Sequence, residues 1–203
     1  MSFLSILTGT KSLMKPNSLT FKQQITWVAV VASVVLVIEV INLLSGRALN
    51  QFSIYPREVQ SLGFIFTSPL LHANFQHFVS NFLTLCIFSF LMLEFGKRTY
   101  INATFFIIVI TGLLVWLFGR TAFHLGASGV VYGYFGYLLL AGFFSKKIHL
   151  IAISIMVVVF YGGLIWGVLP GQPMVSWESH LFGFNAGILL AYLKFKKRKS
   201  ILS

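Results

Sequence analysis

A serine and a histidine stand where neither is needed for packing. Ser128 lies in the tetrapeptide Gly126-Ala127-Ser128-Gly129, and His180 follows 52 positions later. Each begins a long apolar segment typical of a membrane helix. Polar and ionisable groups inside a bilayer are costly and usually functional. A hydroxyl paired with an imidazole predicts a nucleophile and its general base, working within the membrane.

The surroundings of the serine suit that role. Ser128 begins a helix, so its backbone N–H has no partner in the helix and carries the positive end of the helix dipole. Such an N–H beside a serine oxygen forms half of an oxyanion hole. Gly126 and Gly129 allow a tight turn and close approach of a substrate backbone. The alternative is that Ser128 only caps its helix, which serine does well.

Glycines give a reason for the histidine to reach the serine. Gly183 and Gly187 follow His180 on roughly the same helix face, and the helix of the serine offers Gly129 and Gly133. Glycines spaced by four allow membrane helices to pack closely. Contact of the two faces would bring the imidazole within hydrogen-bond reach of the hydroxyl, as a general base requires.

Orientation of the imidazole must come largely from packing. Tyr132 lies one turn beyond the serine and can pack against the His180 ring. The chain has only four acidic residues, which are Glu39, Glu58, Glu94 and Glu178. Glu39 is the one that we place inside the membrane, and it is the less favoured third member of a triad. We therefore predict a Ser-His dyad, with a buried core histidine as the alternative for His180.

A third group of polar residues begins another apolar segment. His77 and Asn81 are four positions apart and share a helix face, so both can donate hydrogen bonds to one developing oxyanion. His72 is expected to be structural and to hold the long loop before it. The rival is a metal site, but no His-Glu-x-x-His pattern or acidic ligand set accompanies these histidines, so we expect no metal and no cofactor. His124 and His149 are predicted to be plain interfacial residues.

The composition predicts a membrane protein with one all-α domain. Of the 203 residues, 57% are hydrophobic and 9% are charged, against roughly a quarter charged in soluble domains. The mean hydropathy is +0.88. The apolar stretches, most of them near the roughly 20 residues that span a bilayer, cover residues 25–44, 70–95, 100–118, 128–144, 148–169 and 177–193. The expected fold is therefore a polytopic bundle of six transmembrane helices.

The net charge of +11 follows a membrane pattern and argues against nucleic-acid binding. If the chain crosses the membrane six times, only three cationic residues lie on one side of the membrane, which are Arg47, Arg57 and Arg120. The other side has Lys11, Lys15, Lys22, Lys97, Arg98, Lys146, Lys147, Lys194, Lys196, Lys197, Arg198 and Lys199. Cytoplasmic loops carry such an excess of cations. Both termini are therefore expected in the cytoplasm, and the protein in a cell membrane, either inner or plasma.

Three segments follow from this topology. Residues 1–24 are expected to form a cytoplasmic or interfacial tail, because their apolar run is too short for a signal-peptide core. Residues 25–193 form the membrane domain. Residues 194–203 form a basic tail that meets anionic lipid headgroups. The single cysteine, Cys86, excludes an internal disulfide framework.

Three connections bear on the site. Residues 45–69 form an unusually long loop, and residues 169–173 contain Pro and Gly and cannot be regular helix. Either connection is a candidate lid or a plain connector. Residues 119–127 must descend from the outer surface to a short helix, and irregular backbone at membrane depth is tolerated only when buried in protein or lining water. A water-accessible cavity open to the outer face is therefore expected there.

Counting along the helices places the polar residues at one depth. A helix rises about 1.5 Å per residue. From the cationic end of its own helix, Ser128 lies roughly 27 Å away, His180 roughly 21 Å, Asn81 roughly 24 Å and His77 roughly 30 Å. In a hydrocarbon core about 30 Å thick, these residues fall in the outer third. The agreement does not depend on any motif.

Three motifs in this order resemble those of the rhomboid intramembrane serine proteases. They are His72-x4-His77-x3-Asn81, Gly126-Ala127-Ser128-Gly129 and His180-x2-Gly183-x3-Gly187. The resemblance covers residues from about 54 to 193. The outer loop departs from it, since Tyr55-Pro56-Arg57-Glu58 stands where many rhomboids have a Trp-Arg dipeptide.

The resemblance implies the six-helix bacterial rhomboid core. It also implies Ser128 as nucleophile, His180 as general base, and His77, Asn81 and the Ser128 N–H as oxyanion donors. The implied substrates are transmembrane segments of other membrane proteins, admitted laterally with movement of the fifth helix and the loop after it. The predicted function is thus an intramembrane serine endopeptidase that works through an acyl-enzyme.

Two other functions fit part of the pattern. A non-catalytic rhomboid-like protein that binds or escorts membrane helices would need neither Ser128 nor His180. A small transporter lined by polar residues would explain the common depth but not the Gly-Ala-Ser-Gly setting.

Overall fold

The computed structural model describes residues 19–171 and 175–202, with side chains described as far as residue 195 in the last helix. In chain order the elements are α2 (Phe21–Leu44), η1 (Ala48–Phe52), η2 (Val59–Ile65), η3 (Ser68–Leu70), α3 (Phe75–Leu93), α4 (Lys97–Phe118), α5 (Ser128–Ser145), α6 (Ile148–Tyr161), η4 (Gly162–Val168) and α7 (Trp177–Leu202). The α elements are α-helices and the η elements are short 3-10 helices. The predicted all-α class is confirmed for this part of the chain.

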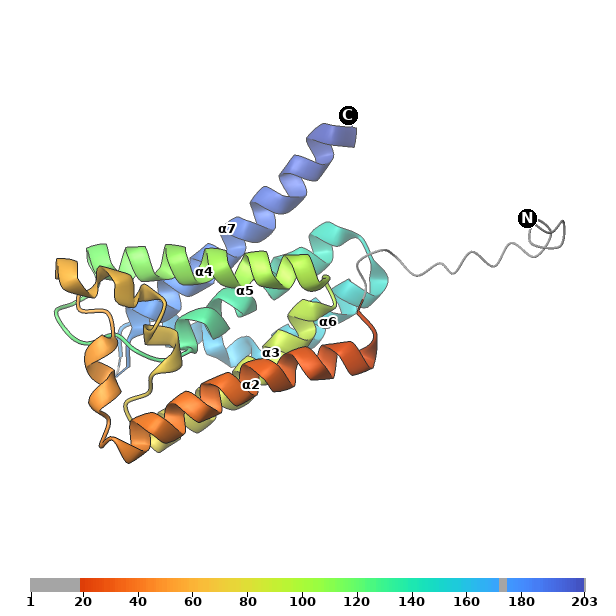
Figure 1. The fold of residues 1–203 in the computed structure, drawn as a ribbon. Helices are drawn as coiled ribbons and strands as arrows, with labels where there is room; N and C mark the ends of the chain where they lie inside the picture. Colours follow the sequence, from red (N-terminus) through yellow and green to blue (C-terminus); the bar gives the residue numbers. More distant parts are fainter. Residues whose placement is uncertain (1–18, 172–174, 203) are drawn as a thin grey trace, which may run out of the picture.

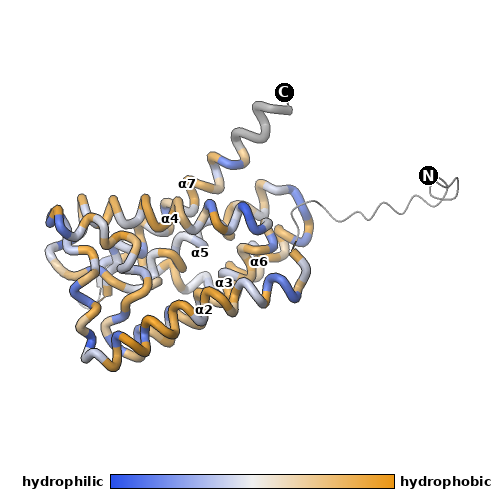
Figure 2. The backbone as a smooth tube through the Cα atoms, viewed as in Figure 1, coloured by the Kyte–Doolittle hydropathy of each residue, from blue (hydrophilic) through white to orange (hydrophobic). Residues whose placement is uncertain are grey.

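Five segments among the described residues are long and apolar enough to cross a membrane. They are α2, α3, α4, α5, and α6 taken together with η4. Figure 2 shows apolar residues running along the helices and hydrophilic residues gathered toward the ends of the bundle. The chain is accordingly a multi-pass membrane protein. The sixth predicted crossing, residues 177–193, lies within α7 and stays a prediction.

Helix α5 lies at the centre of the bundle (Figure 1). In its most apolar 18 residues 78% are buried, against 17% in those of α2 and in those of α6 taken together with η4. It contacts α3, α4, α6 and α7, and its longest interface is with α7. Helix α2 packs on α3 at the periphery. Ser128 is the first residue of the central helix, and we call this end of the bundle the Ser128 end.

Two helix ends differ from the apolar stretches because the sequence supplies a cap or a breaker. Helix α3 begins at Phe75 because Asn74 is its N-cap, with a side chain that accepts the His77 N–H. The α-helical part of the fifth apolar stretch ends at Tyr161, before a pair of glycines, and the chain continues as η4. Helix-disfavouring glycines account for that change.

The predicted tails and lid are described only in part. Thr20 and Gln23 form a capping box, so α2 starts four residues inside the expected tail of residues 1–24. Residues 1–18 of that tail lie outside the described residues, as do residues 172–174, which overlap the candidate lid. Helix α7 continues through the segment expected to be the C-terminal tail, as far as Leu202.

The long loop between α2 and α3 is folded over the Ser128 end of the bundle, where Figure 1 shows it as the orange to yellow segment. Arg57 ties it to the connection between α4 and α5. Its Nη1 donates to the Gly119 carbonyl at 2.8 Å, and its Nη2 donates to Thr121 Oγ1 at 3.1 Å. Ile54 adds an isolated backbone bridge to His124. The stretch that departs from the rhomboid dipeptide therefore anchors this loop.

Candidate active site

Glycines bring α5 and α7 into backbone contact. A methyl group added at Gly183 would overlap the carbonyl of Gly129, and one added at Gly187 would overlap the carbonyl of Gly133. Small residues allow membrane helices to approach this closely. The two faces predicted from glycine spacing therefore lie together, and His180 is one turn before this contact on α7.

The imidazole of His180 is held from two sides. Its ring stacks on Tyr132, with centroids 4.1 Å apart and an interplanar angle of 7°. Its Nδ1 lies 2.9 Å from the carbonyl oxygen of Gly167. A carbonyl only accepts, so Nδ1 must carry the proton and donate it, which leaves Nε2 as the basic nitrogen. Gly167 is needed here, because a side chain would overlap the Tyr132 hydroxyl.

Ser128 is the first residue of α5 and is 7% exposed. The N-cap of the helix is Ala127, and no side-chain capping hydrogen bond is made there. The alternative in which Ser128 only caps the helix is therefore wrong. The Ser128 hydroxyl does not act as the cap, and the Ser128 N–H is one of the donors at the helix start that have no partner within the helix.

His77 and Asn81 of α3 face the turn before the serine. Gly126 has φ +119°, and a methyl group there would lie 2.7 Å from the His77 ring and 3.3 Å from Asn81 Nδ2. Positive φ and this crowding both require glycine. Asn81 Nδ2 is buried and has no hydrogen-bond partner within the described residues. An unused buried donor costs free energy, and this one lies beside Gly126, in the turn that leads to Ser128.

Comparison with known families identifies the family of the chain. A model described as the Rhomboid domain matches residues 59–197. The chain belongs to the rhomboid family. An uncharacterized protein of Mycobacterium tuberculosis strain H37Rv is 38% identical over 165 residues, which cover 77% of this chain and 69% of that protein.

Two further relatives carry the family in their names. RHOMBOID-like protein 4 of Arabidopsis thaliana is 35% identical over 130 residues, which cover 61% of this chain and 32% of that protein. YdcA of Bacillus subtilis, which its name gives provisionally as a rhomboid protease, is 26% identical over 143 residues, or 66% of this chain and 68% of that protein.

In this rhomboid, His124 is a structural part of the site region, so its prediction as a plain interfacial residue is wrong. It is 2% exposed. Its Nδ1 lies 2.6 Å from Ser176 Oγ, which in turn lies 2.7 Å from Ser179 Oγ. Burial lowers its pKa. These hydrogen bonds tie the connection between α4 and α5 to the start of α7, directly before His180. His149, by contrast, is exposed at the start of α6.

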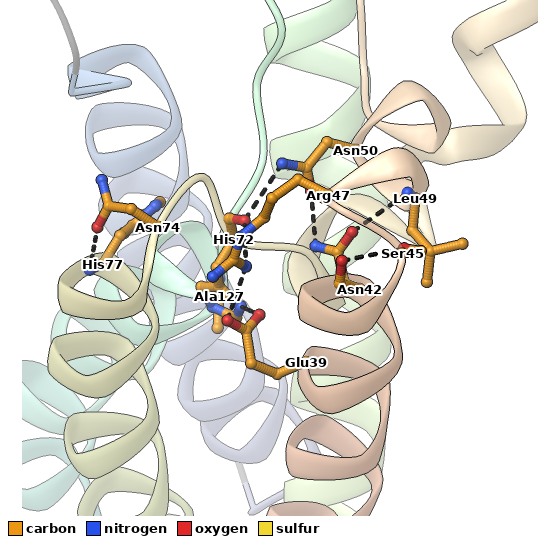
Figure 3. Close-up of polar contacts among 10 residues, drawn as sticks. All are labelled: Glu39, Asn42, Ser45, Arg47, Leu49, Asn50, His72, Asn74, His77 and Ala127. Carbon is orange, nitrogen blue, oxygen red and sulfur yellow. Dashed lines mark hydrogen bonds and ion pairs between the residues drawn. The ribbon is translucent and has the colours of Figure 1, made fainter.

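Two acidic residues of this rhomboid, Glu39 and Glu178, are paired with groups other than His180. Glu39 is bonded to Arg47, whose Nη1 is 2.7 Å from Glu39 Oε1, and its other oxygen faces His72 at 3.6 Å (Figure 3). Glu178 faces Arg120 at 3.6 Å. The unfavoured triad through Glu39 therefore finds no support. The sequence does not predict Arg47 and His72 as the partners of Glu39, because these contacts depend on how residues 45–74 fold.

Two hollows lie at the Ser128 end of this rhomboid. A cavity of about 30 Å³ lies behind the serine turn, lined in part by Thr111, Gly126, Gly129 and Ser179. An open cleft of about 450 Å³ is lined by Arg47, Ala48, Asn50, Gln51, Phe123 and Leu125. Ser128 and His180 line neither of these two, so the predicted water-accessible cavity at the pair stays a prediction.

Proposed function

We propose that this rhomboid is an intramembrane serine endopeptidase that cleaves transmembrane segments of other membrane proteins. The observation that carries the proposal is the setting of His180. Its Nδ1 is engaged by the Gly167 carbonyl and its ring is stacked on Tyr132, which leaves Nε2 as a base of fixed direction. The glycine contacts between α5 and α7 bring the two helices together one turn beyond His180 and next to Ser128, which supports the pairing of this base with that serine.

The proposed reaction is acyl transfer. His180 Nε2 takes the proton of Ser128 Oγ as the oxygen attacks the scissile carbonyl. The resulting oxyanion accepts hydrogen bonds from His77, from Asn81 Nδ2 and from the Ser128 N–H. The protonated imidazole then gives its proton to the leaving amine. Water then attacks the acyl-enzyme and gives a proton to the same histidine, which returns it to Ser128 Oγ as the ester bond breaks and the acid product leaves.

The proposed topology has six crossings, with α7 as the sixth and both termini in the cytoplasm. Its support is the charge pattern, with twelve cationic residues on one side and three on the other. The Ser128 end then faces the outer side of a cell membrane. Water would reach the pair from that side, while a substrate helix would enter from the lipid.

The test uses purified protein in detergent or proteoliposomes with a fluorescent transmembrane substrate. Wild type is expected to cleave it and to react with a fluorophosphonate probe. Ser128→Ala and His180→Ala are expected to lose at least about 10³-fold in kcat. Ser154→Ala and His149→Ala are matched controls, a buried serine and an exposed histidine on α6, and should keep full activity.

Two results would overturn the proposal. Undiminished cleavage by Ser128→Ala would remove the nucleophile. Absence of both cleavage and probe labelling in wild type, over several unrelated transmembrane substrates, would favour a non-catalytic rhomboid that binds or escorts helices.

A further inference from the structure

We propose that Glu39 is a positioning residue for the catalytic serine, acting through His72 on the Ala127–Ser128 segment. The inference rests on the proposed function and assigns a role in it to α2, a helix that carries none of the reacting groups. Figure 3 shows the residues involved, which come from α2, from the loop after it and from the start of α5.

Glu39 is a buried acid with one satisfied and one unsatisfied oxygen. It is 3% exposed, and a buried carboxylate persists only when it is paired and hydrogen-bonded. Arg47 Nη1 bonds Oε1 at 2.7 Å. Oε2 faces His72 Nδ1 at 3.6 Å, and neither of these two atoms has a hydrogen-bond partner within the described residues. The two orphaned atoms complement each other as acceptor and donor.

The other ring nitrogen of His72 decides where the ring proton lies. Ala127 donates its backbone N–H toward His72 Nε2 at 3.5 Å. A neutral imidazole has one donor and one acceptor, so an accepting Nε2 leaves the proton on Nδ1, toward Glu39. Burial lowers the pKa of His72, which keeps the ring neutral. The bond from Ala127 is at the long limit of the hydrogen-bond range, and the separation from Glu39 lies just beyond it. Glu39 therefore acts on the ring as a facing carboxylate that favours the proton on Nδ1 and so keeps Nε2 directed at Ala127.

Arg47 holds both Glu39 and the backbone of His72 in place. Besides its bond to Glu39, its Nη1 donates to the His72 carbonyl at 2.9 Å, and Asn50 Nδ2 donates to the same oxygen at 3.2 Å. Arg47 has φ +69°, in the left-handed region that non-glycine residues rarely adopt. Such a conformation persists only where the surrounding contacts hold it, and it often marks a functional site.

The consequence falls on the serine. Ala127 is the N-cap of α5, and the preceding Gly126 is pinned by its N–H to the Ser68 carbonyl at 2.9 Å. With the Ala127 N–H also directed, the orientation of the next peptide is set, and that peptide supplies the Ser128 N–H to the oxyanion. A displacement of about 1 Å at a reacting group can cost on the order of 10²-fold in rate.

The alternative is that Glu39 and Arg47 only anchor the outer loop to α2. Asn42 is the matched control for that role. It is fully buried on the same helix and holds the same loop through Asn50 and the Leu49 N–H. Asn42 makes no bond to His72 or Ala127 within the described residues. Loss of Asn42 therefore removes loop anchoring and leaves the contact between Glu39 and the His72 ring in place, since Asn42 reaches His72 only at its backbone carbonyl, through Asn50.

The experiment compares Glu39→Leu, Glu39→Gln and Asn42→Leu with wild type, measuring kcat and KM per folded molecule, with the folded fraction taken from thermal unfolding. Glu39→Leu is expected to lower kcat about tenfold or more, with KM within about twofold. Glu39→Gln keeps an oxygen that can accept the His72 proton, so it should recover kcat to within about threefold of wild type. Asn42→Leu should leave kcat unchanged even where it lowers Tm.

A double variant tests the path itself. If Glu39 acts through His72, Glu39→Leu combined with His72→Leu should be no slower than His72→Leu alone, because the two losses are one. Additive losses, or a kcat for Glu39→Leu equal to wild type, would overturn the inference. If Glu39→Leu does not fold, Glu39→Asp decides, since the shorter carboxylate keeps its charge beside Arg47 but draws back from His72. Its fluorophosphonate labelling rate should then fall about tenfold, and an unchanged rate would overturn the inference.

The two proposals fail in different ways. Inactive wild type, or an active Ser128→Ala, would refute the proposed protease. Wild-type cleavage that depends on Ser128 but not on Glu39 would refute this inference alone.

Discussion

The serine segment is held on its two sides by different kinds of contact. On the α7 side, Gly183 and Gly187 press against the carbonyls of Gly129 and Gly133. On the α2 side, the half-buried Arg47 and the buried Glu39 and His72 form a row of polar groups that leads toward Ala127. Close packing sets the distance between two helices and tolerates almost no added volume. Hydrogen bonds set the direction of a single peptide and depend on charge and protonation. The glycine contacts therefore place the proposed reacting pair, and the polar groups orient the peptide before Ser128.

The largest effect is expected where the close-packed side is disturbed. Gly187→Ala would push a methyl group into the carbonyl of Gly133, and neither backbone can move aside, because both belong to long helices. We expect a loss of about 2–3 kcal/mol or more in stability, with loss of cleavage. Gly163→Ala is the matched control, since a methyl group there meets no atom within 4 Å. Thermal unfolding of both variants in detergent, alongside cleavage assays, measures the difference. Equal Tm values would show that the glycine contact between α5 and α7 is not close-packed.

Sequence alone could predict the α7 side because its information is local. Spacing by four places Gly183 and Gly187 on one face, and the same spacing recurs on the helix of Ser128. The α2 side could not be predicted in this way. The apolar surroundings of Glu39 in the sequence predict that it is buried. Its partners Arg47 and His72 belong to the loop between α2 and α3, and only the folding of that loop brings them to Glu39.

His124 shows the same limit. Its position between two helices resembled that of an exposed interfacial residue. Its burial depends on Ser176, 52 positions later, and on a backbone bridge to Ile54. No periodic pattern links residues so far apart, so only the tertiary structure identifies such contacts.

The next largest effect tests a group that orients the reaction rather than placing it. Asn81→Ala removes a buried donor that has no partner within the described residues. The loss of one oxyanion donor should lower kcat about 10²- to 10³-fold. Stability should change little, because no existing hydrogen bond is broken and the buried amide no longer lacks a partner. Activity and Tm measured on the same preparation check both halves. A large fall in Tm with a proportionate fall in activity would make Asn81 structural.

The smallest expected effect is a dependence of stability on pH. It distinguishes the hydrogen bonds of His124, which involve a titratable group, from the glycine contacts between α5 and α7, which do not. Burial, the largest influence, lowers the pKa of His124 below its ordinary value of 6.5, although the Arg120 carbonyl and Glu178 oppose the shift. The unfolded chain therefore binds this proton more readily than the folded protein, so stability falls as pH drops below about 6.5. Above that pH both states hold a neutral ring, and this contribution is constant.

His124→Gln removes the titration, so its stability should depend less steeply on pH between 7.5 and 5 than that of wild type. The other buried histidines are present in both proteins, and the difference between the two thermal-unfolding curves isolates His124. Gly163→Ala, which alters no titratable group, should run parallel to wild type. If His124→Gln also runs parallel to wild type, the bond from His124 to Ser176 survives protonation. The start of α7 would then be held by a charged histidine, and the polar contacts before His180 would be as insensitive to pH as the glycine contacts after it.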